Sequence, residues 1–308
     1  MPLLTRRKVF AAKIETTAGT AETITSAEGV YNALDFDIQP NIAMTRREGQ
    51  GGFNYLAGIP EGMMGTCKLK HEMHYDGTTI PTWASVLLPA CGWVDTAGTF
   101  SPVSEGPGSN VKTLTLAHYK DGKRTLLSGA MGTFRMVFPT GKVAYIEFTF
   151  TGKYSTNETD TALIAPTYPT TLPMRFAQGA LTWNSVALCT SSVEVDAGNS
   201  VVMRECVNAT DRSGYVSAIV TDRAPVITAD PESVLVATQD RDAHWLSSLP
   251  YAMVIQLGTA GGAVTVNAPK AQLENKQQGD RNKMAVDTLT WLATKGSAVD
   301  TELTIVFD

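Results

Sequence analysis

Carboxylates recur at alternate positions of two short β-prone segments of this chain. Asp35 and Asp37 stand two residues apart in the first segment, and Glu194 and Asp196 have the same spacing in the second. Side chains two apart on a strand share a face, and a carboxylate pair on one face could exchange protons with a substrate or hold a cation. Because the pair occurs twice, we favour a structural surface over a single active site; simple exposure to solvent is the alternative.

The other motifs with chemical potential point away from catalysis. His71 and His74 have the spacing HExH, which places two strand side chains on opposite faces, so a polar strand face is favoured over a zinc site. The glycines of Gly258–Gly262 lack the lysine of a phosphate loop and indicate a turn. The four cysteines have no CxxC or zinc-type spacing, which indicates buried thiols in a reducing compartment. We therefore predict no catalytic residues, no cofactor and no metal.

Composition limits the class of protein. A chain of 308 residues can form two domains with real cores, and 43% apolar with 18% charged residues indicates a globular protein with a lightly charged surface. Such surfaces are typical of assembly interfaces. The net charge of −5 argues against a nucleic-acid binder, which usually carries a basic stripe. No window has ~18 continuous apolar residues and no signal-peptide core is present, so we expect no membrane segment and synthesis in the cytoplasm.

The second half of the chain repeats the plan of the first half at low identity. The matched landmarks are Leu34–Ile38 with Val193–Asp196, Met44–Glu48 with Met203–Glu205, Lys68–His74 with Val226–Glu232, a helix carrying Trp83 with one carrying Trp245, and Phe134–Pro139 with Val264–Pro269. We predict a mainly β fold with two tandem domains, each with a short flanking helix and long loops. The predicted parts are an N-terminal arm (1–32), a first β domain (33–154), a linker (155–175) and a second β domain (176–308).

Alternation of apolar and polar residues predicts the individual elements. In Tyr145–Thr151 the apolar side chains fall on one face, which predicts a half-buried strand. Short helices are predicted over Pro81–Gly92 and Asp240–Leu249, with Trp83 and Trp245 facing the sheet. Strands of the first half are predicted at about 33–39, 66–75, 111–119, 123–128, 131–138 and 143–154.

The segment Asn41–Gly65 combines many glycines with large apolar side chains. A solvated loop rarely carries so much apolar surface. We predict a long hairpin or arm that packs on a neighbouring subunit; the alternative is an arm folded back on its own domain. The candidate contact residues are Phe53, Tyr55, Leu56, Ile59, Met63 and Met64.

Several motifs, taken in order, resemble the tail tube (major tail) proteins of long-tailed, siphovirus-type bacteriophages. The resemblance covers most of the chain and rests on Lys13–Thr20, Pro81–Trp83, Leu87–Trp93, Leu127–Phe134, Ala144–Gly152 and Ile219–Pro225. It implies β-sandwich or partial-barrel domains with a flanking helix and a protruding loop. Subunits of that family form rings whose inner strands close a β-barrel around a DNA channel, and the rings stack into a tube.

The resemblance also implies partners and a location. The common ring contains six single-domain subunits, but a duplicated chain favours a ring of three chains with six pseudo-equivalent domains; six chains are the alternative. Tape measure and tail-end proteins are the other expected partners, DNA passes through without specific binding, and the protein resides in the virion as a structural, non-enzymatic component.

A channel that passes DNA should not grip the phosphate backbone, because each fixed cation adds favourable binding. We therefore expect a lumen that is acidic on balance, although Lys68 and Lys70 argue against that strand as part of it. The candidates on polar strand faces are Asp35, Asp37, Glu72, Glu147, Glu194, Asp196, Asp230 and Asp287.

A second hypothesis from another class is a carbohydrate-binding or glycoside-cleaving β-sandwich. Asp35 and Asp37 would then act beside a sugar platform made by Trp83 or Trp93. Glycoside cleavage needs two carboxylates on opposite sides of a cleft. Neighbours on one strand face do not form such a cleft, so this hypothesis ranks second.

Overall fold

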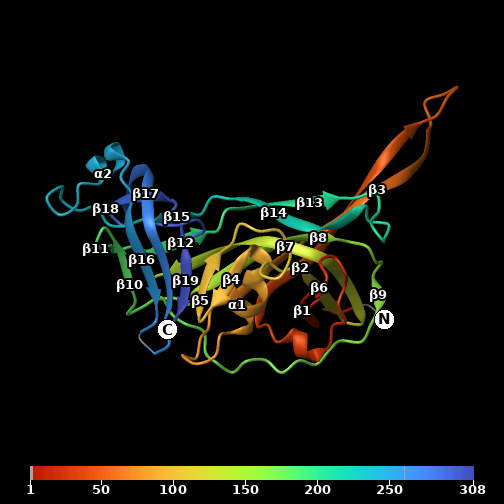
Figure 1. The fold of residues 1–308 in the computed structure, drawn as a ribbon, viewed down its shortest axis with the longest axis horizontal. Coiled ribbons are helices and arrows are strands. Elements are labelled where there is room, and N and C mark those ends of the chain that lie inside the picture. Colours follow the sequence, from red (N-terminus) through yellow and green to blue (C-terminus); the bar gives the residue numbers. More distant parts are fainter. Residues whose placement is uncertain (1–2, 260) are drawn as a thin grey trace.

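The computed structural model describes residues 3–259 and 261–308 and confirms a mainly β fold (Figure 1). The first half pairs its strands in the order β2–β3–β8–β7–β6–β1, with every pair antiparallel. Its elements are β1 (Lys8–Ile14), η1 (Ser26–Gly29), β2 (Ala33–Glu48), β3 (Tyr55–Glu72), α1 (Thr82–Leu87), η2 (Leu88–Cys91), β4 (Trp93–Thr96), β5 (Thr99–Pro102), β6 (Leu114–Lys120), β7 (Lys123–Pro139), β8 (Tyr145–Lys153) and β9 (Thr159–Asp160).

The second half repeats this strand order. Its strands pair as β12–β15–β18–β17–β16–β10, so each strand has a counterpart at the same place in the first half, and α2 follows β15 as α1 follows β3. Its elements are β10 (Ala180–Trp183), β11 (Val186–Ala187), β12 (Ser192–Asp196), β13 (Asn199–Glu205), β14 (Tyr215–Arg223), β15 (Val226–Ala229), α2 (Arg241–Ser247), β16 (Tyr251–Leu257), β17 (Val264–Arg281), β18 (Met284–Ala293) and β19 (Thr304–Phe307).

Two long strands, β7 and β17, bend from one layer of each half to the other. The first part of each pairs with β6 or β16 and the last part with β8 or β18, with a register shift at Ser128–Met131 in β7 and at Leu273–Asn275 in β17. Two predictions are corrected here. The segments 123–128 and 131–138 form one bulged strand. Val264–Pro269 corresponds to the start of β7 rather than to Phe134–Pro139, because it pairs with β16 as the start of β7 pairs with β6.

The halves are joined into one body. β7 pairs with β12 across the boundary, and one buried cluster includes Phe134 and Phe148 of the first half together with Trp183 and Trp291 of the second. The N-terminal residues are not a free arm, since β1 pairs with β6 and buries Phe10 in this core. Within 155–175 the chain is mostly irregular, but β9 pairs with the start of β7.

A long hairpin leaves each half. The first arm, residues 39–65, continues β2 and β3 far beyond the body and projects into solvent (Figure 1). The second arm, residues 198–225, contains β13 and β14 and instead bends over the first half. Gly198 makes the bend with a positive φ of 62°, where an added Cβ would collide with the Ala224 carbonyl oxygen.

The two helix tryptophans differ in burial. Trp83 is 1% exposed and its Nε1 donates to the His74 carbonyl oxygen at 3.1 Å, as expected. Trp245 is 39% exposed, so the prediction that it is buried against the sheet is wrong; its Nε1 donates to the Glu274 carbonyl oxygen at 2.9 Å at the rim of β17. α1 buries Trp83, Ala84 and Leu87, whereas Arg241 is the buried residue of α2, so α2 covers less of its sheet than α1 does.

This difference predicts unequal costs of truncation. Trp83→Ala should lower the free energy of unfolding by about 3–5 kcal/mol, because it empties a fully packed site. Trp245→Ala should cost under about 2 kcal/mol, because part of the indole is already in water. Urea unfolding of the unassembled chain measures both, and equal costs for the two variants would contradict the assignment.

Candidate assembly surfaces

Pairing between the halves creates one continuous eight-stranded sheet with an exposed face. Its order is β2–β3–β8–β7–β12–β15–β18–β17. We call the side of this sheet away from the core the ladder face, because charges of alternating sign cross it on successive strands. The partners in that row are Asp35, Lys70, Glu147, Arg135 and Asp196, followed by the uncharged Val226, Leu292 and Gln272.

Ion pairs connect these neighbours. Lys70 Nζ lies 3.6 Å from Glu147 Oε1, and Arg135 lies 3.8 Å from Glu147 Oε2 and 3.4 Å from Glu194 Oε1. These side chains are 34–44% exposed, so each pair contributes under about 1 kcal/mol. Their main consequence is electrostatic: the ladder face offers short-range compensation of charge rather than an uninterrupted acidic wall.

Six of the eight predicted lumen carboxylates lie on the ladder face. Asp35 and Asp37 are its most open acidic groups, with side chains 86% and 55% exposed. The six share the face because they occupy alternate positions of β2, β3, β8 and β12; they are Asp35, Asp37, Glu72, Glu147, Glu194 and Asp196.

The remaining two candidates are engaged elsewhere. Asp287 points to the helix side of β18, where it is 4% exposed and pairs with Arg241 Nη1 of α2 at 2.7 Å, so its placement on a polar strand face is wrong. Asp230 follows β15 and binds Arg281 at 2.9 Å. Partial burial acts to raise the pKa of Asp230, but hydrogen bonds from Ser191 and Thr190 outweigh it and hold the pKa at about 2.

The first arm exposes most of its apolar side chains. Phe53, Tyr55, Leu56 and Ile59 have relative exposures of 106%, 65%, 52% and 53%, whereas Met63 and Met64 are partly covered at its root. The hairpin prediction is confirmed, and the alternative of an arm folded back on its own domain is wrong (Figure 1). An exposed set of this size is unusual on a monomer and marks an interaction surface.

The eight-stranded sheet ends in two open edges. β2 pairs only with β3, and residues 275–281 of β17 pair only with β18 among the strands that the structure describes. The counterparts of these two edges are paired with each other. β12, the counterpart of β2, pairs with the last part of β7, the counterpart of β17, from Arg135–Asp196 to Pro139–Ser192. Each open edge is therefore the equivalent of an edge that already has a partner inside the chain.

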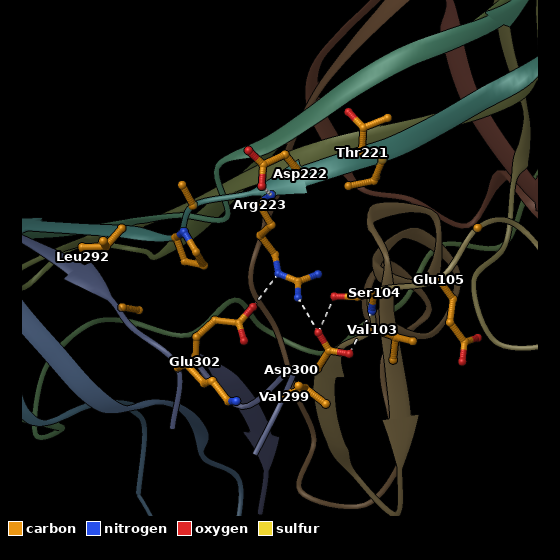
Figure 2. A pocket seen from close by; sticks show the side chains of 16 residues that line it. Val103, Ser104, Glu105, Thr221, Asp222, Arg223, Leu292, Val299, Asp300 and Glu302 are labelled. Atoms are coloured by element: carbon orange, nitrogen blue, oxygen red, sulfur yellow. Dashed lines mark hydrogen bonds and ion pairs between the residues drawn. The ribbon is translucent and has the colours of Figure 1, made fainter. Parts of the chain in front are cut away.

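A cleft of about 800 Å³ lies at the root of the second arm (Figure 2). Arg223 forms its floor, donating to Glu302 at 2.6 Å and to Asp300 at 3.0 Å, and Asp300 in turn accepts from Ser104. The Arg223 side chain is 9% exposed. The polar groups of this network bind one another and tie the second arm to both halves.

The histidines show no metal-site geometry. His71 is buried against Trp83 and His74, and no group of three or more His, Cys, Asp or Glu side chains able to hold a metal occurs within 3–259 and 261–308. Burial lowers the pKa of His71 to about 4, and the neighbouring His74 adds to that effect.

This shift predicts loss of stability in mild acid. The unfolded chain binds a proton at His71 below about pH 6.5, whereas the folded chain binds it only near pH 4, so the contribution present above pH 6.5 disappears as the pH falls through this window. Between pH 7 and 4.5 the free energy of unfolding should fall by about 2–3 kcal/mol more in the wild type than in His71→Phe. Urea unfolding at both pH values checks this, and parallel losses would contradict it.

The sugar platform of the second hypothesis is absent. Trp83 and Trp93 are 1% and 0% exposed, so neither indole can stack on a sugar. Sequence reasoning missed Arg135 and Arg223. The alternation of Phe134, Met136 and Phe138 is a signal that could have put Arg135 on the opposite face, but strand pairing is needed to show that Arg135 lies between carboxylates of two halves.

In comparisons with known proteins, no protein-family model and no curated protein matches this chain. Among the residues that the structure describes, no helix is long and apolar enough to cross a membrane.

Proposed function

We propose that this protein is the structural subunit of a phage tail tube. Three chains form a ring of six pseudo-equivalent domains, and rings stack into a tube through which DNA passes. The subunit is made in the host cytoplasm, acts in the virion, meets tape measure and tail-end proteins, and performs no catalysis. A ring of six chains remains the alternative stoichiometry.

The pairing of β7 with β12 is the observation that carries this proposal. This pairing joins two equivalent domains edge to edge, with the β7 edge of the first half against the β12 edge of the second half. Repeating the same contact pairs the open part of β17 with β2 of the next chain and covers both open edges of the eight-stranded sheet once the ring closes. Exposed-face positions of β17, such as Gln277 and Gly279, then adjoin Asp35 and Asp37, and the ladder face becomes the wall of a barrel.

The charges of the ladder face suit the passage of DNA. Its cations Lys70 and Arg135 each lie within 4 Å of carboxylates, and the exposed Lys68 stands opposite Asp37 in the strand pairing, so carboxylates compete with phosphates for these cations. Asp35 and Asp37 add exposed negative charge, which Lys8 offsets in part because its Nζ lies 3.8 Å from Asp35 Oδ1. The duplex is kept off the wall, which allows fast transit.

Electron microscopy of the purified full-length chain tests the proposal. We expect rings or tubes with a central channel and a sixfold-like outline that resolves into three chains. The mass of a single ring gives the number of chains in it. A protein that remains monomeric over a broad range of concentration and salt, without rings or tubes, would refute the tail tube.

A further inference from the structure

The two arms are equivalent in origin but differ in what they contact. Each arises between the first two strands of its half's exposed sheet, and they have nearly equal length, 39–65 and 198–225. Their apolar pairs also correspond: Ile42 opposite Met63 and Met44 opposite Pro60 in the first arm match Val201 opposite Val220 and Met203 opposite Ala218 in the second.

The second arm already has a seat. Ala218 is fully buried with Met131 and Val111, and Val201, Met203 and Val220 pack against this cluster. The tip reaches farther: Asp211 pairs with Lys153 Nζ at the end of β8 at 2.7 Å, and the Ser213 carbonyl oxygen accepts from the Met63 amide at 3.0 Å. The seat of the tip is thus the end of β8 together with the root of the first arm.

The corresponding place in the second half is the cleft shown in Figure 2. The counterparts of β8 and of the first arm's root are the end of β18 and the root of the second arm. Leu292, Ala293 and Lys295 of the former and Val220–Pro225 of the latter line this cleft. Among the described residues of the chain, nothing equivalent to the second arm's tip fills this cleft.

We infer that this cleft receives the tip of the first arm from a second copy of the chain. The inference rests on the ring of the proposed function, which sets β2 of that copy beside β17 and carries its first arm over β17 and β18. The apolar tip residue Phe53 then reaches the side chains of Val299 and Leu292, both of which line the cleft.

Charge complementarity supports this occupant. The cleft lining carries four carboxylates, Glu105, Asp222, Asp300 and Glu302, against the cations Arg223 and Lys295. The positive charge of Arg223 is already neutralised by its ion pairs with Asp300 and Glu302. The first arm carries two exposed arginines, Arg46 and Arg47, whose charge is opposite to that of this acidic rim.

Photo-crosslinking in assembled tubes tests the seat. A photoreactive phenylalanine analogue at Phe53 should crosslink to 220–225 or 292–302, and mixing isotope-labelled with unlabelled chains should show that the link joins two copies. The same analogue at Leu246, which is 85% exposed on α2, is the matched control and should give no link to these segments.

A variant of the cleft supplies a second readout. Val299 is 72% exposed, so Val299→Arg should fold normally while crowding the seat, and it should reduce the Phe53 crosslink about tenfold, equal to ~1.4 kcal/mol. Val299→Ala is its control. Normal tubes whose Phe53 crosslinks fall elsewhere would overturn the seat and leave the proposed function standing. Absence of any ring or tube in the wild type would overturn both.

Discussion

Removing the end of the first arm should abolish tube formation while leaving a folded, monodisperse chain. In the variant, residues 45–62 are deleted and Ala43–Met44 is replaced by Asn-Gly, which closes a two-residue hairpin between the paired Ile42 and Met63. The deleted part contributes no residue to the buried core. It carries the exposed Phe53, so its apolar surface is available for neighbouring chains.

Negative-stain images and sedimentation measure the outcome. We expect no tubes at concentrations where the wild type assembles fully, with a melting temperature within a few degrees of the wild type. Leu246→Ser removes an equally exposed apolar side chain outside the arm and should assemble normally. Normal tubes from the deletion variant would show that the arm does not hold the assembly together.

A single proline in the open edge of β17 should prevent ring closure. The amide of Asp287 donates to the Pro231 carbonyl oxygen on the side away from β17, so its partner Gln278 belongs to a non-hydrogen-bonded pair. The Gln278 amide therefore points to the open edge. Gln278→Pro removes that donor and places a ring where a neighbouring strand must approach, while the bonds to β18 remain.

The matched control is Gln278→Ala, which keeps the amide. We expect Gln278→Pro to stay folded by circular dichroism but to lose rings and tubes, and Gln278→Ala to assemble like the wild type. If the proline variant forms closed rings of ordinary diameter, the edge of β17 is not the closing contact, and the pairing of β7 with β12 is not the template for contacts between chains.

Local alternation was enough to predict several features of the surface. The burial of Tyr145–Thr151 alternates as expected, and Asp35 and Asp37 share an exposed face, because a strand directs successive side chains to opposite sides. The hairpin over 41–65 followed from its glycines and apolar residues, and the matched landmarks indicated the repeated strand order that both halves have.

Long-range pairing decided what the sequence could not. Asp287 shares the core side of β18 with Leu289 and Trp291 by alternation, but its partner there, Arg241 of α2, comes from a distant segment and leaves no local signal. Trp245 is 39% exposed because α2 lies at the rim of its sheet, where its indole reaches the Glu274 carbonyl oxygen of β17.

The sequence by itself determined a mainly β, repeated chain with acidic strand faces and an apolar hairpin, because these depend on residue type and a period of two. The tertiary structure decided which edges stay open, which carboxylates are paired, and where a cleft lies at the root of the second arm. Those properties depend on contacts between residues far apart in the chain, such as Arg135 with Glu194 and Arg223 with Asp300. Side-chain periodicity within one strand carries no information about which distant strand will lie beside it.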